Sequence, residues 1–328
     1  MVGILTSLLP PSVAWNGPDI ARTHSWIYRF SEIALDEIDR AVTHIKKKSL
    51  PLEKISKEDF AVPSLAEDFA SIANELEHGR GFIQLRGLRI DTYDQKAAEI
   101  VFWGIGMQLG NPIYQNGKRE LLGRVRDEGL DVNGGNVRLY QTNARQEFHT
   151  DIAGDVVGLM CLQTAKSGGQ SRVASAMAIY NELLTKYPWY VALLYNNFFI
   201  DARGEQPDGA PPAYREPIYA LFEDRLSCRF KSRFIRTAQE KTGVKLAKVE
   251  EEAINLMEQL AEELCFENDF EPGDIQFINN HVILHGRTAF QDHEDPKRRR
   301  HLLRLWLDVP VARKLPPELR RDPARILG

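Results

Sequence analysis

The sequence predicts a mainly β, α+β protein in which flanking helices surround a β-sandwich or jelly-roll core. Short strand-like segments follow one another between residues 80 and 310, and only a few helical segments interrupt them. No regular alternation of strands with helices is present, and the G-x-G-x-x-G motif is absent. These observations argue against a doubly wound α/β fold.

Residues 1–79 are predicted to form a helical extension that packs on this core. Within it, residues 31–48 carry an apolar stripe with the 3.6-residue period of a helix. Its members are Leu35, Ile38, Val42 and Ile45. A second helix is expected to begin at Ser64 and Glu67, which have the spacing of a capping box, and to end at Gly79.

The core, residues 80–310, is expected to contain most of the strands. Strands are predicted at residues 81–88, 155–165, 196–201, 217–223, 225–231 and 300–310. Helices are predicted at 97–110 and 248–265, a strand followed by a helix at 171–188, and a turn, strand and loop at 271–290. No domain linker is apparent, so residues 1–328 are expected to form one domain.

Residues 111–148 show neither the 3.6-residue period of a helix nor the two-residue period of a strand. The stretch holds scattered charges and five glycines, Gly117, Gly123, Gly129, Gly134 and Gly135. A long irregular segment inside a compact domain is commonly a lid or a binding loop, and this is the expectation here. The alternative is a disordered surface loop.

Composition and charge narrow the class of protein. The 328 residues are 43% hydrophobic and 27% charged, which is typical of a globular protein. A net charge of −4 and a pI near 6.1 do not favour a nucleic-acid-binding protein. No apolar run is long enough for a membrane span, and the N-terminus does not resemble a signal peptide.

The three cysteines, Cys161, Cys228 and Cys265, are widely spread and include no C-x-x-C pair. This pattern argues against a disulfide framework and a structural zinc site, and it favours a cytoplasmic protein. We expect a small-molecule substrate and no nucleic-acid or membrane partner; a homo-oligomer is left open.

The stretch QEFHTDIAGD, residues 146–155, places a histidine and an aspartate two residues apart. On a strand or strand end through residues 148–152, His149 and Asp151 would point to the same side, with Cα atoms about 6–7 Å apart. One imidazole nitrogen and one carboxylate oxygen could then bind a single metal ion. Taken alone, the H-x-D pattern is a weak signal, because an N-cap or a surface ion pair explains it equally well.

A third metal ligand must come from elsewhere in the chain. His285 is the preferred candidate, because it follows an apolar strand and precedes Gly286, which leaves room beside it. His281, four residues earlier in NNHVILHGRTAF, is the alternative ligand. Two histidines and one carboxylate with open coordination positions form the facial triad of non-haem Fe(II) oxygenases.

The last predicted strand carries two arginines. If Arg300 and Arg304 share one face of it with Leu302, two guanidiniums point inward from an apolar strand. Buried cations need anionic partners, and arginine binds a carboxylate through two parallel hydrogen bonds. A dicarboxylate co-substrate could be one partner; a structural ion pair with protein carboxylates is the alternative.

Three stretches of the chain resemble the taurine/2,4-D dioxygenase (TauD/TfdA-like) family of Fe(II)- and 2-oxoglutarate-dependent oxygenases. They are FHTDIAGDVVGLMCLQTAKSGGQSRVAS, NNHVILHGRTAF and RHLLRLWL, which contain HTD, GG-x-S, HGR and R-H-x-x-R in that order. The resemblance runs from about Phe82 to Pro310. It implies a double-stranded β-helix, the jelly-roll core, in agreement with the strand-rich pattern.

The resemblance also implies the catalytic metal ligands and the reaction. His149, Asp151 and His285 would hold Fe(II). With O2, 2-oxoglutarate would be converted to succinate and CO2 while a C–H bond of the substrate is hydroxylated. Desaturation, ring closure and heteroatom dealkylation are variants of this chemistry.

Further roles concern the two organic ligands. Arg300 would bind the distal carboxylate of 2-oxoglutarate, and Ser171 stands where the family usually has a threonine whose hydroxyl touches that carboxylate. Arg304 matches a position that contacts the acidic group of the prime substrate, or else it shares the co-substrate with Arg300. The substrate is expected to be a small acid such as an amino acid, carboxylate or sulfonate, with a larger natural-product intermediate left open.

The segment 111–148 would then close over the iron. Just before the ligands it contains four candidate substrate contacts, Tyr140, Gln141, Asn143 and Arg145. Two other functions are the alternatives to the oxygenase: a zinc-type metal hydrolase and a non-catalytic jelly-roll binding protein. The hydrolase gives no reason for Arg300 on an interior strand, and a binding protein gives no reason for an intact ligand set.

Overall fold

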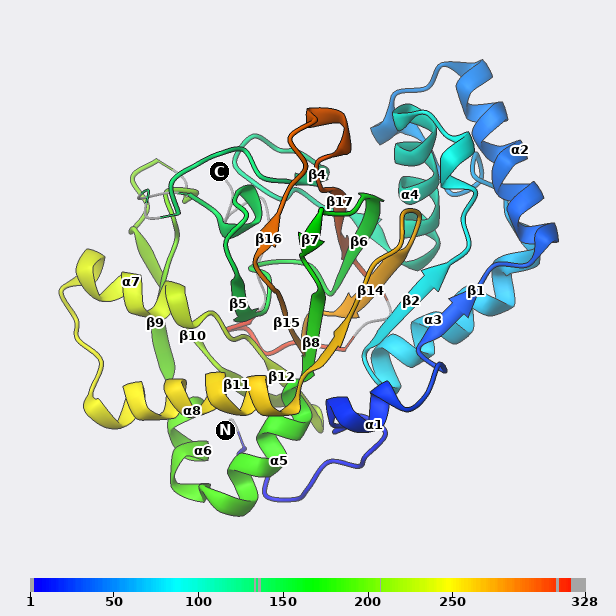
Figure 1. The fold of residues 1–328 in the computed structure, drawn as a ribbon. Helices are drawn as coiled ribbons and strands as arrows, with labels where there is room; N and C mark the ends of the chain where they lie inside the picture. Colours follow the sequence, from blue (N-terminus) through cyan, green and yellow to red (C-terminus); the bar gives the residue numbers. More distant parts are fainter. Residues whose placement is uncertain (1–2, 133, 135–136, 207, 311–312, 320–328) are drawn as a thin grey trace.

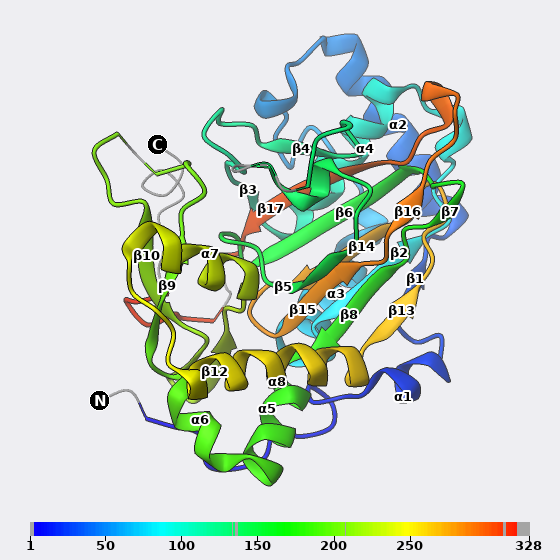
Figure 2. The same ribbon diagram turned by 60° about the vertical axis from the view of Figure 1, so that its left-hand side comes forward.

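The computed structural model describes residues 3–132, 134, 137–206, 208–310 and 313–319. Its core consists of two facing sheets (Figures 1 and 2). The larger sheet has the order β1-β2-β14-β6-β17-β3, with β4 also paired to β17. Its strands are β1 (Ile27–Arg29), β2 (Phe82–Arg86), β14 (Ile275–Asn279), β6 (Val156–Gln163), β17 (His301–Asp308), β3 (Asn111–Pro112) and β4 (Leu122–Val125).

The smaller sheet has the order β13-β8-β15-β5 and is antiparallel throughout. Its strands are β13 (Phe266–Asn268), β8 (Ser171–Ser175), β15 (Ile283–Arg287) and β5 (Gln146–His149). One apolar cluster contains Phe82 and Trp306 from the larger sheet together with Val173 and Ile283 from the smaller one. The two sheets therefore share one interior, and this confirms the predicted jelly-roll core.

Helices cover the outer faces of both sheets (Figure 2). On the larger sheet, a second apolar cluster joins Leu303, Leu305 and Leu307 of β17 to the helices α2 (Glu32–Lys48), α3 (Ala66–His78) and α4 (Gln95–Leu109). The alternate residues of β17, among them Arg304, face the interior instead, as the two-residue period of a strand requires.

The remaining elements surround the smaller sheet and the pocket. The helices are α1 (Gly17–Ala21), α5 (Ala176–Lys186), α6 (Pro188–Leu194), α7 (Ser232–Thr242) and α8 (Lys248–Leu264). The strands are β7 (Ser167–Gly168), β9 (Asn197–Asp201), β10 (Ala213–Pro217), β11 (Tyr219–Phe222), β12 (Arg225–Cys228) and β16 (Phe290–Gln291). None of the described helices is both long and apolar enough to span a membrane.

The N-terminal helices follow the sequence prediction only in part. The predicted stripe of α2 is buried, and the Ser31 side chain caps its first turn by accepting the N–H of Ala34. The capping box predicted for α3 is wrong: a 3-10 turn at Pro63–Leu65 precedes the helix, and the Ser64 hydroxyl donates to Glu37 of α2 instead. The extension also contributes the strand β1, which lies parallel to β2.

The predicted lid, residues 111–148, is less irregular than its sequence suggests. It contains β3 and β4, which pair with β17, and it ends in β5. Gly135, one of its five glycines, lies outside the described residues. The described part of the segment is thus attached to both sheets, to the larger one through β3 and β4 and to the smaller one through β5 (Figure 1).

Candidate metal centre and its pocket

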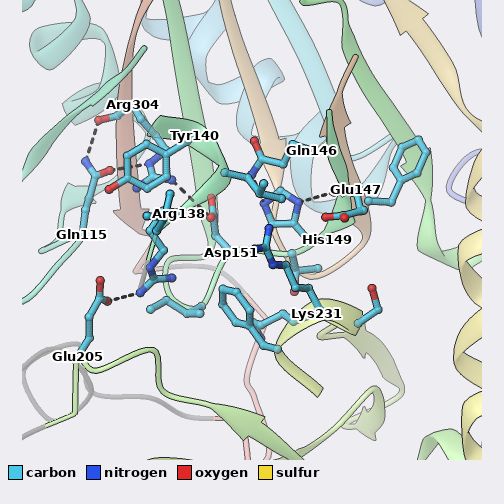
Figure 3. Close-up of a pocket in the computed structure, with 18 of the residues that line it drawn as sticks. Gln115, Arg138, Tyr140, Gln146, Glu147, His149, Asp151, Glu205, Lys231 and Arg304 are labelled. Atoms are coloured by element: carbon cyan, nitrogen blue, oxygen red, sulfur yellow. Dashed lines mark hydrogen bonds and ion pairs between the residues drawn. The ribbon is translucent and has the colours of Figure 1, made fainter. Parts of the chain in front are cut away.

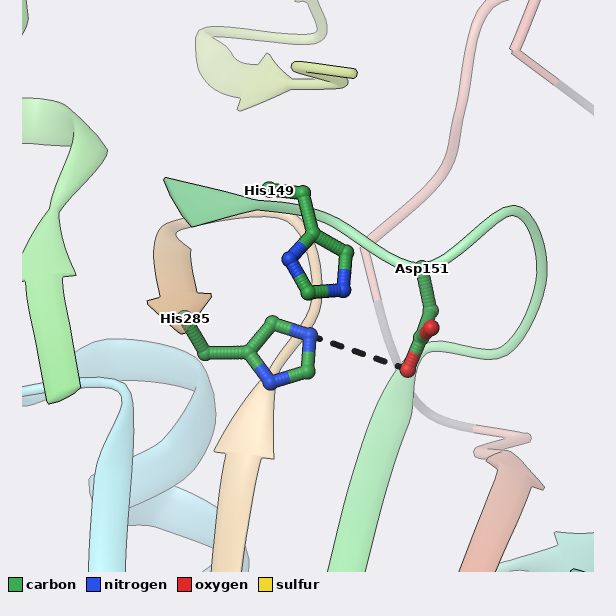
Figure 4. A group of neighbouring side chains, drawn as sticks. All are labelled: His149, Asp151 and His285. Atoms are coloured by element: carbon green, nitrogen blue, oxygen red, sulfur yellow. Dashed lines mark ion pairs between the residues drawn. The ribbon is translucent and has the colours of Figure 1, made fainter. Parts of the chain in front are cut away.

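Three predicted ligands come together at one end of the jelly roll. His149, Asp151 and His285 each offer a ligand atom, and these atoms lie within 4.8 Å of one another (Figure 4). The two histidines are directly paired in register across the neighbouring strands β5 and β15, and their rings stack with centroids 4.3 Å apart. Strand pairing therefore fixes the separation of the two imidazoles.

Asp151 reaches the cluster from a loop. The predicted strand or strand end through residues 148–152 is found as a strand end: β5 ends at His149, and Asp151 lies two residues beyond it. Thr150 leaves the sheet to bind Phe230, with its N–H donating to the Phe230 carbonyl at 2.8 Å and its hydroxyl accepting from the Phe230 N–H at 3.1 Å. This contact turns the chain so that Asp151 faces the two histidines.

One buried amide organises the loop after Thr150. The side-chain oxygen of Asn280 accepts the N–H of Asp151 at 2.8 Å. Its nitrogen donates to the carbonyls of Asp151, Ala153 and Gly154 at 3.2, 3.0 and 2.9 Å. Asn280 is fully buried and belongs to the turn between β14 and β15, so the turn that precedes His285 also holds the backbone of Asp151. Its only sequence signal was its place in the NNH triplet.

Hydrogen bonds orient the imidazole of His149. Its Nδ1 lies 2.9 Å from the Glu147 carbonyl, to which it donates, so Nε2 is the nitrogen that turns toward the cluster (Figure 3). The amide nitrogen of Gln146 lies 3.1 Å from that Nε2. Burial lowers the pKa of His285 to about 3, so its ring is neutral at physiological pH.

Asp151 stays ionised despite its burial. Burial alone would raise its pKa, but the Arg304 guanidinium, the two histidines and the Trp306 indole outweigh that effect and hold the pKa below its ordinary value. Trp306 donates its indole N–H to Asp151 Oδ2 at 2.9 Å, and Arg304 Nη1 lies 3.7 Å from Oδ1.

These donors fit a divalent transition metal. His285 Nε2 is buried, has no hydrogen-bond partner among the described residues, and lies 3.7 Å from Asp151 Oδ2. A buried lone pair facing a carboxylate is costly unless something binds both. Two imidazoles and one carboxylate with open positions are the ligand set of non-haem Fe(II) sites.

The alternative ligand, His281, is not brought to this cluster. Its Nε2 lies 2.8 Å from Asp155 Oδ1, and the ring is fully buried in the turn before β15. Burial lowers the pKa of His281 well below its ordinary value. Within the described chain, His281 therefore orders the same loop as Asn280 rather than joining the ligand atoms.

A pocket opens beside the ligands (Figure 3). His149 and Asp151 line it, and Arg304 projects into it from β17. The Arg304 guanidinium lies between the rings of Tyr140 and Trp306, at 4.6 and 4.7 Å from their centroids, and its Nε donates to Gln115 Oε1 at 2.7 Å. A cation is thus fixed next to the ligand carboxylate.

Only one of the four predicted substrate contacts lines this pocket. Tyr140 does so, whereas Gln141 donates to Glu128 and Arg145 forms an ion pair with Glu262 on α8. Asn143 is held through its backbone, because its carbonyl accepts the N–H of Phe290 at 3.1 Å. Sequence reasoning missed other polar lining residues, namely Gln115, Arg138, Gln146, Glu147, Glu205, Lys231 and Arg233.

Arg300 and Ser171 are buried and do not line this pocket. Arg300 is 5% exposed, and its Nη1 is buried with no hydrogen-bond partner in the described part of the chain. Gly169 packs against it: φ is +81°, and a Cβ there would lie 3.1 Å from Arg300 Nε, so both conformation and space favour glycine. The Ser171 hydroxyl donates to Gln276 Oε1 at 2.7 Å. Arg300 and Gly169 line a second pocket, next to Cys161 and Phe270.

Comparisons with known proteins agree with this geometry. The family model described as "Taurine catabolism dioxygenase TauD, TfdA family" matches residues 47–306. FR-33289 synthase of Streptomyces rubellomurinus is 34% identical over 325 residues, covering 97% of this chain and 96% of the synthase. The taurine hydroxylase-like protein SAT17 of Stachybotrys chartarum is 31% identical over 330 residues, covering 97% of this chain and 84% of that protein.

Solved structures show the same fold at low sequence identity. An asparagine oxygenase in complex with Fe(II), 3-hydroxyasparagine and succinate superposes with a TM-score of 0.66 at 16% identity, covering 86% of this chain and 93% of its own. The non-haem iron oxygenase OrfP, in complex with Fe, succinate and 3-hydroxyarginine, gives a TM-score of 0.65 at 14% identity, covering 86% and 94%.

Proposed function

The chain belongs to the taurine catabolism dioxygenase TauD, TfdA family. From this we propose that it uses Fe(II), 2-oxoglutarate and O2 to oxidise a C–H bond of a small anionic substrate. The observation that carries the proposal is the convergence of His149, Asp151 and His285 within 4.8 Å, beside a pocket that contains the fixed cation of Arg304. Membership of a dioxygenase family favours this function over a zinc-type hydrolase and over a non-catalytic binding protein.

In this proposal His149, Asp151 and His285 hold the iron. Bound iron and 2-oxoglutarate supply the oxidising chemistry, in which the keto acid is converted to succinate and CO2 while a substrate C–H bond is oxidised. The protein keeps the His285 imidazole neutral and Asp151 ionised, and each of these forms is the one that binds a metal. Glu147, Trp306 and Asn280 orient the three ligands through hydrogen bonds.

Arg300 is the proposed partner of the distal carboxylate of 2-oxoglutarate. Its buried Nη1 and the absence of any ion pair to it among the described residues support this role, because a buried guanidinium lacks its counter-charge without an anion. Ser171 is proposed to help, since it lies on β8 opposite Arg287 of β15 and carries a hydroxyl that can turn from Gln276 to a carboxylate.

The prime substrate is proposed to place an acidic group near Arg304, with Tyr140 beside it. The ring of Tyr140 and the amide of Gln115 fix the guanidinium, so an anion meets a cation that needs little reorganisation. Arg138 and Arg233 add positive charge to the wall, and Glu205 pairs with Arg138 at 2.6 Å. A small acid or amino acid suits this lining. The names of the relatives, among them an asparagine oxygenase and a taurine hydroxylase-like protein, support the same class.

Of the other predicted contacts, Gln141, Asn143 and Arg145 remain predictions. We also propose that residues 1–328 form one domain, since β1 of the extension pairs with β2 of the core. A cytoplasmic location is proposed on the basis of the three cysteines, which are all free.

The proposed function is tested by measuring succinate. Purified protein is incubated with Fe(II), ascorbate, O2 and 2-oxoglutarate, and a panel of small acids that includes amino acids and sulfonates is added. We expect succinate formation that depends on iron and rises with the right acid, and that is abolished in Asp151→Ala and His285→Ala. His281→Ala, with its melting temperature recorded alongside, is the comparison: it keeps all three ligand side chains, so it should bind iron more tightly than either ligand variant. Turnover with zinc and without 2-oxoglutarate would instead establish the hydrolase.

A further inference from the structure

Arg287 is a buried cation two residues after the metal ligand His285. It is only 5% exposed, and no described residue forms an ion pair with it. A buried guanidinium without a carboxylate is expensive unless other groups satisfy it. The side chain must therefore bind other polar groups.

Its partners are backbone carbonyls of the pocket wall. Arg287 Nη2 donates to the carbonyls of Leu139, Thr142 and Ala144 at 3.4, 3.1 and 2.6 Å. These residues lie in the short segment 139–144, which contains one 3-10 turn and no strand. The Leu139 carbonyl also accepts the N–H and the hydroxyl of Thr142. The carbonyls of Thr142 and Ala144 have no sheet partner, and the guanidinium of Arg287 supplies their donor.

The same segment carries Tyr140, whose ring lies against Arg304. The Arg304 guanidinium is 4.6 Å from the Tyr140 ring centroid and 3.7 Å from the carboxylate of Asp151. A physical chain of contacts thus runs from Arg287 through the backbone of residues 139–144 to Tyr140, and on to the cation beside the metal ligands.

We propose that Arg287 is a positioning residue of the pocket: it ties residues 139–144 to the strand that carries His285, and so keeps Tyr140 against Arg304. The inference deepens the proposed function and rests on it for the meaning of the pocket. Arg287 touches neither substrate nor iron in this scheme. It acts through the backbone that it holds.

Arg287 is also placed to sense the co-substrate. The guanidiniums of Arg287 and Arg300 lie over the same ring, that of Phe290, at 4.5 and 5.2 Å from its centroid. Each keeps at least one buried nitrogen without a partner in the described chain. Two cations that share one aromatic ring repel each other, and a dicarboxylate bound at Arg300 would offset the repulsion. Binding of 2-oxoglutarate should therefore strengthen the hold of Arg287 on residues 139–144, which couples the two ligand sites.

Hydrogen–deuterium exchange of the full-length protein tests the proposal. The peptide that covers residues 139–146 is followed in the metal-free protein and again without oxygen in the presence of Fe(II) and 2-oxoglutarate. We expect Arg287→Met to speed exchange in this peptide at least about tenfold in the metal-free protein, because hydrogen bonds from a charged group are lost. Arg287→Lys, which keeps a charge and three donors, should restore part of the protection.

Arg86→Met is the matched control. Arg86 is also a largely buried arginine, on β2 of the larger sheet, but its guanidinium binds the carboxylate of Asp274. Its loss should lower the melting temperature and leave exchange in residues 139–146 unchanged. Exchange at the wild-type rate in Arg287→Met, or equally fast exchange in Arg86→Met, would overturn the positioning role.

The second arm isolates the coupling. In the wild type, 2-oxoglutarate should slow exchange of the peptide further, and in Arg287→Met this extra protection should vanish. Equal extra protection in both proteins contradicts the coupling. If calorimetry shows that the wild type binds no 2-oxoglutarate, the proposed function fails, while the metal-free comparison still decides the role of Arg287.

Discussion

Trp306 donates its indole N–H to Oδ2 of Asp151 at 2.9 Å, so the last strand of the larger sheet fixes a ligand that lies in a loop of the smaller one. The indole is 2% exposed and also packs in the shared interior. The same residue therefore joins the apolar core to the electrostatics of the metal centre.

Trp306→Phe should weaken Fe(II) binding by about tenfold, because loss of a hydrogen bond to a ligand carboxylate typically costs that much. Anaerobic titration with Fe(II) measures the effect. Trp103→Phe is the control: Trp103 is equally buried on α4, and its indole N–H donates to the Ile55 carbonyl, away from the metal centre. Equal iron affinity in the two variants would refute this role of Trp306.

Asn280→Ala should weaken Fe(II) binding by between about tenfold and a hundredfold. It removes the only side chain that binds both the N–H and the carbonyl of Asp151 among the contacts described above. Asn279→Ala, one residue earlier, removes similar bonds to Leu76 and Glu77 on the other side of the turn. Both variants should lose about 2–4 kcal/mol of stability, since several hydrogen bonds to buried groups are broken.

Iron affinity then distinguishes the two asparagines. Thermal melts give the stability of each variant, and titration of the metal-free protein gives the affinity. Asn279→Ala should bind iron as the wild type does. A parallel loss of affinity in both variants would mean that general loosening of the turn, and not the hold on Asp151, is responsible.

The half-buried ring of His301, which is not a metal ligand, should make the stability of the fold depend on pH. Burial lowers its pKa from 6.5 to about 4, helped by Arg124 and Arg126. As the pH falls from 6.5 towards 4, the unfolded chain takes up a proton that the folded protein refuses, so the free energy of unfolding decreases. Because the glutamine of His301→Gln does not titrate, this variant should lose about 1 kcal/mol less unfolding free energy than the wild type between pH 7 and pH 4.5. The difference is smaller than the full pKa shift would give, because solvent screens the partly exposed ring. Melts at pH 7 and pH 4.5 measure it, and identical losses in both proteins would contradict it.

Periodicity was sufficient to predict the framework. The stripe of Leu35, Ile38, Val42 and Ile45 is buried as expected, and the alternation in β17 sends Arg304 inward. Such patterns show which face of a helix or strand is apolar, and they can be seen in the sequence because they involve residues only a few positions apart. The H-x-D pair and the later histidine also followed from local sequence, and the strand ends between the two ligands of the pair, at His149.

Partners distant in the chain could not be predicted in the same way. Ser64 has the spacing of a cap, yet Glu37 on another helix is its actual partner. Gln115 binds Arg304 across 189 residues, and Asn280 binds Asp151 across 129. Nothing in the spacing of a residue says which distant backbone it will meet. The pocket residues Arg138 and Gln146 were missed for the same reason.

Arg300→Met should raise the dissociation constant for 2-oxoglutarate by about a hundredfold, since a buried charge-assisted pair is lost. Its effect on Fe(II) binding should be small, because Arg300 is separate from the ligand atoms. Ser171→Ala should raise the same constant by no more than about tenfold, the value of one ordinary hydrogen bond. Anaerobic titration of the Fe(II)-loaded protein with 2-oxoglutarate measures both. If Arg300→Met binds 2-oxoglutarate as tightly as the wild type, another residue must bind the distal carboxylate of the keto acid, and Arg304 becomes the candidate for that role.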